Sequence, residues 1–198
     1  KKFLLILLTA MLGLCSWQAS AQQIVEIGTG TNTGYYAPYN SLWGYSFVEQ
    51  VYTATEIGMS GSITTLSFNN NSSGQTNNIT VYMKLVNRSS FSSTSDYETV
   101  TAADIVYSGS HTFSQGWSTI TLDNPFDYDG ASNLLIAVHE YTPGYSTQYF
   151  YTTLVTGTVV SFHSDTEDPD PYNLGSFGGN SYVQDNRNNI KLEIMPNG

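Results

Sequence analysis

The stretch Ile79-Thr80-Val81-Tyr82-Met83-Lys84-Leu85 indicates how this 198-residue chain folds. Its apolar residues at 79, 81, 83 and 85 alternate with Thr80, Tyr82 and Lys84. Successive side chains of a β-strand point to opposite faces of the sheet, so a period of two predicts a strand with one face in the core and one in water. A second stretch, residues 134–138 (LLIAV), is apolar without interruption and predicts a central strand covered on both faces.

Strands of the same kind recur on both sides of these two stretches. No sustained helical period follows residue 21, and further strands are predicted at 24–27, 43–52, 63–68, 105–108, 117–122, 148–154, 159–163 and 190–194. The capping-box pattern of residues 53–56 (TATE) predicts one helical turn. Together with turns rich in Gly, Asn and Ser, this indicates an all-β, jelly-roll-like antiparallel β-sandwich of about ten strands. Loops are predicted at 28–42, 69–78, 86–100 and 164–188, and the long ones disfavour a closed up-and-down barrel.

The first 21 residues have the plan of a secretory signal peptide. Lys1 and Lys2 precede an apolar run at 3–14, and the small residues of 19–21 (ASA) suit cleavage after Ala21. The run is about 12 residues long, shorter than the roughly 20 that a membrane-spanning helix needs. Cys15 is the chain's single cysteine, and the large Leu14 before it disfavours lipidation. We therefore expect a signal peptide at 1–21, one domain at 22–194, the start of a linker to a further domain at 195–198, and a secreted or cell-surface location.

The charge balance narrows the classes of partner. Without Lys1 and Lys2 the chain has four basic residues against sixteen acidic ones, a net charge near −12. Such a surface disfavours nucleic acid and anionic membranes, which both attract clustered Lys and Arg. Acidic loops suit cations such as calcium instead.

Several segments together resemble a known family. They are IGTGT at 27–31, WGYS at 43–46, QVYTATEI at 50–57, GSITTLSF at 61–68, FSSTSD at 91–96, WSTITLD at 117–123, PFDYDG at 125–130, NLLIAV at 133–138, DTEDPDP at 165–171 and RNNI at 187–190. In these segments the chain resembles the β-sandwich module of secreted Bacteroidetes proteins and is similar to the cleaved-adhesin (gingipain adhesin-like) jelly rolls. The resemblance implies surface display, adhesion to a host protein or glycan, and bound calcium. It implies no catalytic residue.

The densest group of carboxylates is the candidate calcium site. Asp165, Glu167, Asp168 and Asp170 lie in one loop that Pro169 and Pro171 would stiffen, and calcium takes six to eight oxygen ligands. A solvated acidic turn explains the same residues equally well, and both interpretations stay open. The segment 127–130 (DYDG) is a weaker candidate, for which a turn is sufficient explanation.

Two groups of tyrosines are the candidate ligand-binding residues. Tyr35, Tyr36 and Tyr39 lie in one predicted loop, and Tyr141 and Tyr145 lie in another. Exposed aromatic rings offer flat platforms for sugar rings or protein anchors. Tyrosine-rich strands are also ordinary in secreted sandwiches, and Trp43, at a predicted strand start, is expected in the core.

Signals for catalysis are weak. The sequence contains neither a Gly-x-Ser-x-Gly elbow nor a His-Glu-x-x-His zinc motif. His139, next to Glu140, has the placement of a general base, but a structural histidine at a strand end is the favoured interpretation. We therefore expect a non-enzymatic adhesion or ligand-binding module. The alternatives are a carbohydrate-binding accessory module of a larger secreted enzyme, a hydrolase and a structural spacer.

Overall fold

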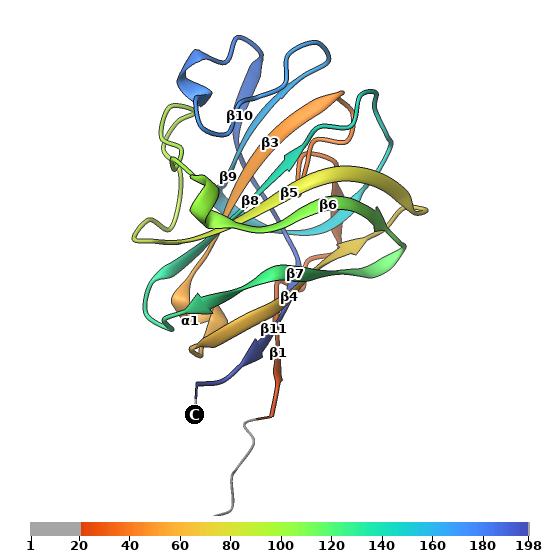
Figure 1. The fold of residues 1–198 in the computed structure, drawn as a ribbon. Helices are drawn as coiled ribbons and strands as arrows, with labels where there is room; N and C mark the ends of the chain where they lie inside the picture. Colours follow the sequence, from red (N-terminus) through yellow and green to blue (C-terminus); the bar gives the residue numbers. More distant parts are fainter. Residues whose placement is uncertain (1–20, 198) are drawn as a thin grey trace, which may run out of the picture.

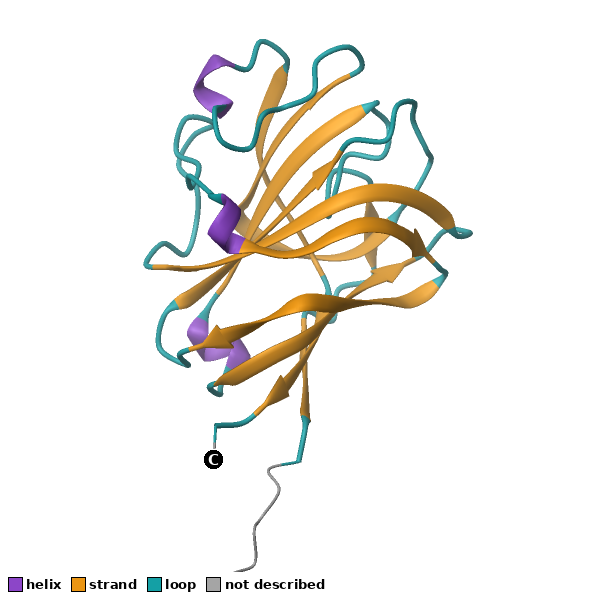
Figure 2. Ribbon diagram, in the orientation of Figure 1, coloured by secondary structure: helices purple, strands orange, loops and turns teal. Residues whose placement is uncertain are grey.

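A computed structural model describes residues 21–197, and the predicted signal peptide lies outside them except for Ala21. Within this range the chain forms eleven β-strands, one short α-helix and two 3₁₀ turns (Figures 1 and 2). The elements are β1 (Gln23–Ile27), β2 (Asn32–Gly34), β3 (Tyr45–Tyr52), α1 (Ala54–Ile57), β4 (Gly61–Asn70), β5 (Gln75–Val86), η1 (Ala102–Asp104), β6 (Ile105–Phe113), β7 (Gly116–Tyr128), β8 (Asn133–Glu140), β9 (Phe150–Ser164), η2 (Leu174–Ser176), β10 (Asn180–Asn188) and β11 (Ile190–Met195).

The strands pair antiparallel in two layers. The larger layer has the order β6-β5-β8-β3-β9-β10, and the smaller has the order β7-β4-β11-β1. A pairing of Asn70 with Phe150 connects the layers, and the short β2 lies along the beginning of β9. Figure 1 shows the two layers crossing, with β1 and β11 at the lower end. The predicted fold class, an all-β antiparallel sandwich that is not a closed barrel, is confirmed.

Two hydrophobic cores cover the two faces of the larger layer. The main core lies between the layers and contains, for example, Ile136 of β8, Leu66 of β4 and Leu192 of β11. The second core lies on the outer face, where Leu135 packs with residues of the segment 87–101 and with Leu174. All residues of 134–138 are fully buried, so the prediction of a central strand covered on both faces is confirmed.

The second core corrects the predicted wet face of residues 79–85. Tyr82 is 3% exposed and belongs to the second core, because the segment 87–101 covers this face. Leu85, predicted in the core, is instead 37% exposed near the end of β5. The alternating pattern therefore identified the strand correctly but not what covers it.

Several strands differ from the predicted boundaries. β2 and β10 lie in segments predicted as loops, and β5 begins inside the predicted loop at 69–78. β9 joins two predicted strands through Gly157, which has a left-handed φ of +66°. β3 starts at Tyr45, so Trp43 precedes the strand. The predicted helical turn is confirmed as α1, with both hydrogen bonds of a capping box between Thr53 and Glu56.

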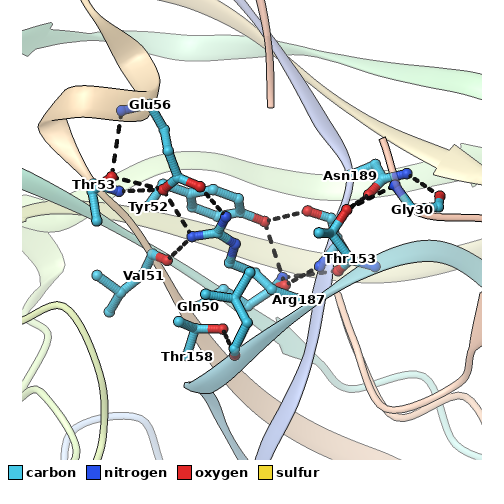
Figure 3. Close-up of polar contacts among 12 residues, drawn as sticks. Gly30, Gln50, Val51, Tyr52, Thr53, Glu56, Thr153, Thr158, Arg187 and Asn189 are labelled. Atoms are coloured by element: carbon cyan, nitrogen blue, oxygen red, sulfur yellow. Dashed lines mark hydrogen bonds and ion pairs between the residues drawn. The ribbon is translucent and has the colours of Figure 1, made fainter. Parts of the chain in front are cut away.

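Three consecutive buried residues, Arg187, Asn188 and Asn189, carry the chain from the larger layer to the smaller one (Figure 3). Arg187 forms an ion pair with Glu56, the same residue that closes the capping box. Its Nη1 also donates a hydrogen bond to the Val51 carbonyl at 2.7 Å. The end of β10 is thereby attached to the end of β3 and to α1.

The two asparagines attach the same crossing to other segments. The Asn188 side chain accepts a hydrogen bond from Gln50 Nε2 at 2.9 Å. Asn189 Nδ2 donates to the Gly30 carbonyl at 2.7 Å, and its Oδ1 accepts from the Thr153 hydroxyl at 2.7 Å (Figure 3). The crossing therefore fixes β3, β9 and the N-terminal segment relative to one another.

Across the described residues, no helix is both long enough and apolar enough to pass through a lipid bilayer.

Candidate functional site

An aromatic pocket opens where the start of β3, the end of β9 and the start of β10 meet. These strand ends lie in the upper part of Figure 1. Strand register brings these segments together, because Tyr45 pairs with Ser164 and Asn180 pairs with His163. The loop that precedes β3 closes the pocket. The pocket has a volume of about 360 Å³ and is lined by Tyr35, Tyr36, Leu42, Trp43, His163 and Tyr182.

The rings in this aromatic pocket contact one another. The His163 ring lies between Trp43, at a centroid distance of 4.9 Å, and Tyr182, at 5.6 Å and nearly parallel. Tyr35 and Tyr36 have centroids 4.2 Å apart, and their hydroxyl groups share a hydrogen bond of 2.8 Å. That hydrogen bond, with burial, raises the pKa of Tyr36 to about 12, so its phenol stays neutral at physiological pH.

His163 is a buried polar group within this aromatic site. The residue is 2% exposed, and its Nδ1 has no hydrogen-bond partner in the part of the chain that the structure describes. Burial lowers the pKa of His163 to about 4, while the charge of Asp165 opposes the shift. The imidazole is therefore neutral at pH 7 and has one N–H donor and one lone pair.

The structure separates the five predicted tyrosines. Tyr35 and Tyr36 line the aromatic pocket. Tyr39 is fully buried and packs against core phenylalanines, so the expectation that it contributes to an exposed platform is corrected. Tyr141 lies beside His139, with ring centroids 5.2 Å apart, and Tyr145 is 75% exposed on a loop. Of the five tyrosines, only Tyr35 and Tyr36 are among the residues that line the aromatic pocket.

The aromatic pocket contains four residues that were not among the predicted ligand-binding ones, Leu42, Trp43, His163 and Tyr182. Trp43 was assigned to the core because it adjoins a predicted strand. His163 and Tyr182 come into contact through the pairing of β10 with β9, and β10 was predicted as a loop. Residues 180–183 (NSYV) do not alternate between polar and apolar, so the sequence offered no period-two signal for this strand.

The four carboxylates of the predicted calcium loop have separate partners. Asp165 accepts a hydrogen bond from the Gly44 N–H at 3.1 Å, Glu167 from the Gly178 N–H at 3.3 Å, and Asp170 from the Tyr172 N–H at 2.9 Å. Asp168 pairs with His139 at 2.6 Å. Among residues 21–197 no three His, Cys, Asp or Glu side chains converge in a metal-binding group. Calcium binding stays a prediction.

The segment 127–130 was the weaker calcium candidate. Asp129 Oδ1 accepts hydrogen bonds from the backbone N–H groups of Ala131 and Ser132, at 2.9 and 2.8 Å. These hydrogen bonds lower the pKa of Asp129. The turn interpretation accounts for this carboxylate.

Two histidines have polar partners at the distances that acid–base chemistry requires, His111 with Ser118 and His139 with Asp168. His111 Nε2 lies 3.0 Å from Ser118 Oγ, but Ser118 is 2% exposed and its hydroxyl also lies within hydrogen-bond distance of the Thr112 carbonyl. His139 and Glu140 alternate on β8 and therefore point to opposite faces. Glu140 is buried and accepts a hydrogen bond from Asn77 at 3.0 Å. Neither contact places a reactive group in a pocket.

A second hollow lies on the smaller layer, beside the N-terminal segment 28–31. It has a volume of about 350 Å³, and its aromatic lining residues are Trp117 and Tyr151. The Lys191 ammonium lies 4.2 Å from the centre of the Trp117 ring and also pairs with Glu26. Since a cation already covers one ring face, this hollow offers less free aromatic surface than the aromatic pocket.

No protein-family model matches this chain, and no curated protein matches it either. The resemblance to adhesin modules therefore stays a prediction, and the function has to be argued from the geometry of the aromatic pocket.

Proposed function

We propose that this chain is an exported, non-enzymatic binding module that holds its ligand in the aromatic pocket. The export signal predicted at 1–21 and the resemblance to adhesin modules support a role at the cell surface or in the medium. In this role the module attaches its bearer to a host protein or glycan.

One observation carries the proposal. The rings of Tyr35, Tyr36, Trp43 and Tyr182 line a hollow of about 360 Å³. Ligand pockets have volumes of roughly 300 to 1,000 Å³ and combine apolar walls with a few polar groups. Aromatic side chains with a polar edge supply both contact area and hydrogen bonds at little entropic cost.

A carbohydrate-binding accessory role is the second candidate, and the same rings favour it. An apolar face of a sugar ring packs against an aromatic ring, while the phenol and indole edges bind hydroxyl groups. The two candidates share the aromatic pocket and differ in the domains that accompany the module. The reading frame after Gly198 separates them, because a catalytic domain supports the accessory role and adhesive repeats support the adhesin.

The test measures binding of the full chain to a glycan array and to a panel of extracellular host proteins. Trp43→Ala and Tyr36→Ala are expected to abolish the binding found. The matched control is Trp117→Ala in the second hollow, which is expected to bind normally. Loss of binding in Trp117→Ala alone would place the site in the second hollow and contradict the proposal.

The predicted calcium site has an independent test. Calcium in the loop 165–170 would stabilise the fold, so excess chelator would lower the melting temperature. An unchanged melting temperature would remove calcium from the proposed function.

A further inference from the structure

A row of tyrosine rings continues from the aromatic pocket onto the neighbouring surface. The Tyr35 ring, which lines the pocket, meets the Tyr149 ring edge-on, with centroids 6.0 Å apart. Tyr149 is 38% exposed, and Tyr151 is partly exposed. Both alternate with Phe150, which is fully buried in the main core, so their side chains point away from that core. We call Tyr35, Tyr149 and Tyr151 the aromatic track.

The aromatic track is too long for a ligand that fills the pocket alone. Alternate residues of an extended strand lie about 7 Å apart, and this separation between Tyr149 and Tyr151 adds to the 6.0 Å between the rings of Tyr35 and Tyr149. The Tyr151 hydroxyl donates a hydrogen bond to Asn71 Oδ1 at 2.7 Å, which holds the last ring in place. A ligand that contacts both the pocket and Tyr151 therefore has to be elongated.

The second hollow marks the far end of the aromatic track. Tyr151 also lines this hollow, together with Trp117. Beyond Tyr151, however, the Lys191 ammonium lies 4.2 Å from the centre of the Trp117 ring and pairs with Glu26. Because a charged pair occupies the surface there, we place the end of the uncharged aromatic surface at Tyr151.

The charge of this surface excludes two classes of elongated ligand. The residues that line the aromatic pocket and form the aromatic track include no Lys, Arg, Asp or Glu. Without the predicted signal peptide, the chain has four basic residues against sixteen acidic ones, a net charge near −12. Nucleic acids and anionic polysaccharides would find no cation on the track and would be repelled by the whole chain.

The backbone of the aromatic track disfavours an extended peptide. A peptide that adds to a sheet gains affinity from the free backbone groups of an edge strand. Here Tyr151 already pairs with Thr33 of β2, and the Tyr149 carbonyl accepts a hydrogen bond from the Asn71 N–H at 2.7 Å. The track therefore offers ring faces and hydroxyl edges, which suit the apolar C–H faces and the hydroxyl groups of sugar units.

We propose that the ligand is an uncharged linear glycan, which places one end in the aromatic pocket and its following units across Tyr149 and Tyr151. This proposal rests on the proposed function, because the pocket holds part of the same ligand. It adds that the module recognises a polysaccharide chain rather than a single sugar, and that Tyr149 and Tyr151 contribute to affinity.

The first test measures how affinity depends on the length of the glycan. The full chain is titrated by calorimetry with neutral gluco-, xylo- and manno-oligosaccharides, each from the disaccharide to the hexasaccharide, and with polygalacturonate as an anionic polymer. In at least one neutral series we expect affinity to rise with each unit that reaches another ring and then to level off. Polygalacturonate is expected not to bind.

Substitutions then connect the gain in affinity to the aromatic track. Tyr149→Ala and Tyr151→Ala are each expected to weaken hexasaccharide binding about ten-fold, as for the loss of one ring contact, and to leave disaccharide binding unchanged. Tyr151→Phe retains the ring and should bind the hexasaccharide more tightly than Tyr151→Ala. Tyr172→Ala is the matched control, because Tyr172 is 51% exposed but packs against Tyr82 of the second core, and it should bind normally.

Each opposing result has a separate meaning. If the hexasaccharide binds no better than the disaccharide, and Trp43→Ala alone abolishes binding, the aromatic track is overturned while the proposed function stands. Binding of polygalacturonate, or of no neutral oligosaccharide, overturns the glycan class. If Tyr149→Ala weakens hexasaccharide binding and both Trp43→Ala and Tyr36→Ala leave it unchanged, the pocket is not the site and the proposed function fails.

Discussion

Glu49 is a buried carboxyl group in the middle of β3. Its side chain has no exposed surface, and one oxygen accepts a hydrogen bond from the Glu98 N–H at 3.0 Å. Burial raises the pKa of Glu49 to about 8, although this hydrogen bond and the charges of Arg88 and Lys84 oppose the shift. The folded protein therefore holds this carboxyl largely protonated at pH 7.

A raised carboxyl pKa makes the protein less stable as pH rises. The folded state holds the proton more tightly than the unfolded chain, so the stabilisation is complete below about pH 4.3 and is lost as pH rises through 8. At 1.36 kcal/mol per pKa unit, the shift from the unfolded value to about 8 corresponds to a free-energy change on the order of 5 kcal/mol. Glu49→Gln should abolish this loss, so urea unfolding at pH 5 and pH 9 should show a smaller difference than in the natural sequence. Glu193→Gln, at a partly exposed position, is the control. If the free energy of unfolding falls equally between pH 5 and pH 9 in the natural sequence and in both variants, Glu49 is not the group responsible.

Arg187 and Glu56 form the ion pair that links β10 to α1. Arg187 is 2% exposed, whereas Glu56 is one-third exposed. Burial alone would raise the pKa of Glu56, but hydrogen bonds from Arg187 and Thr53 outweigh burial and lower it. Its stabilisation is therefore present above the unfolded pKa and is lost as pH falls through the folded one.

Glu56→Gln is expected to destabilise the protein by about 3 kcal/mol, because it leaves a buried guanidinium without its counter-charge. Arg187→Met combined with Glu56→Gln should recover part of that loss, since an apolar side chain needs no counter-charge. Denaturant unfolding of the two single variants and the double variant measures the coupling between them. Purely additive effects would show that the pair contributes nothing beyond each residue alone.

At the scale of elements, the turn within β9 requires the backbone conformation of Gly157. This residue lies between the parts of β9 that were predicted as two strands, and its φ of +66° is rarely adopted by residues with a Cβ. Its N–H donates to Asp185 at 2.7 Å, and its carbonyl accepts from the Phe91 N–H at 2.7 Å. The turn in β9 therefore contacts both β10 and the segment that covers the second core.

Gly157→Ala is expected to cost about 1–3 kcal/mol in the free energy of unfolding. An alanine at this position would have a strained backbone φ, and its Cβ would lie 3.1 Å from the Phe91 carbonyl oxygen. Gly116→Ala is the matched control, because Gly116 has a similar φ of +83° but nothing within 4 Å of the new Cβ. Thermal unfolding should show a larger loss for Gly157→Ala, and equal losses would mean that the contact with Phe91 has no effect.

The elements predicted best from sequence are those whose own residues indicate their structure and burial without knowledge of the partner strands. The run at 134–138 needs no partner to identify it as buried, and the capping box at Thr53 is a local pattern. In contrast, β2 consists of three polar or small residues (NTG), and it is a strand because it pairs with Thr152 and its neighbours. β10 is mostly polar because its layer edge is solvated, so its composition resembles a loop.

The candidate site was predicted only in part for the same reason. Tyr35 and Tyr36 are adjacent in sequence, and their loop position indicated a surface role. Tyr182 and His163 are separated along the chain and meet only through the register of β10 on β9. Tyr39 resembles its neighbours in sequence but points into the core. Spacing does not distinguish these orientations in a loop, where side chains follow no fixed period.

At the scale of the whole molecule, the main core and the buried crossing at 187–189 both bind the two layers to each other. The main core takes side chains from β4, β7 and β11 of the smaller layer and from β5 and β8 of the larger one. Residues 187–189 join the layers covalently, and their hydrogen bonds attach the crossing to β3 and β9 of the larger layer. Because neither layer can bury its inner face without the other, the layers should not unfold separately.

Two tryptophans make this cooperativity measurable. Trp43 reports on the larger layer and Trp117 on the smaller, so two variants that each retain one of them, with Trp17→Phe in both, observe the layers independently. Their urea unfolding curves are expected to have the same midpoint and slope. Asn188→Ala, which removes the hydrogen bond with Gln50, should lower both midpoints equally. If the Trp43 and Trp117 curves separate, in the parent or in Asn188→Ala, the two layers are distinct folding units and the shared core does not couple them.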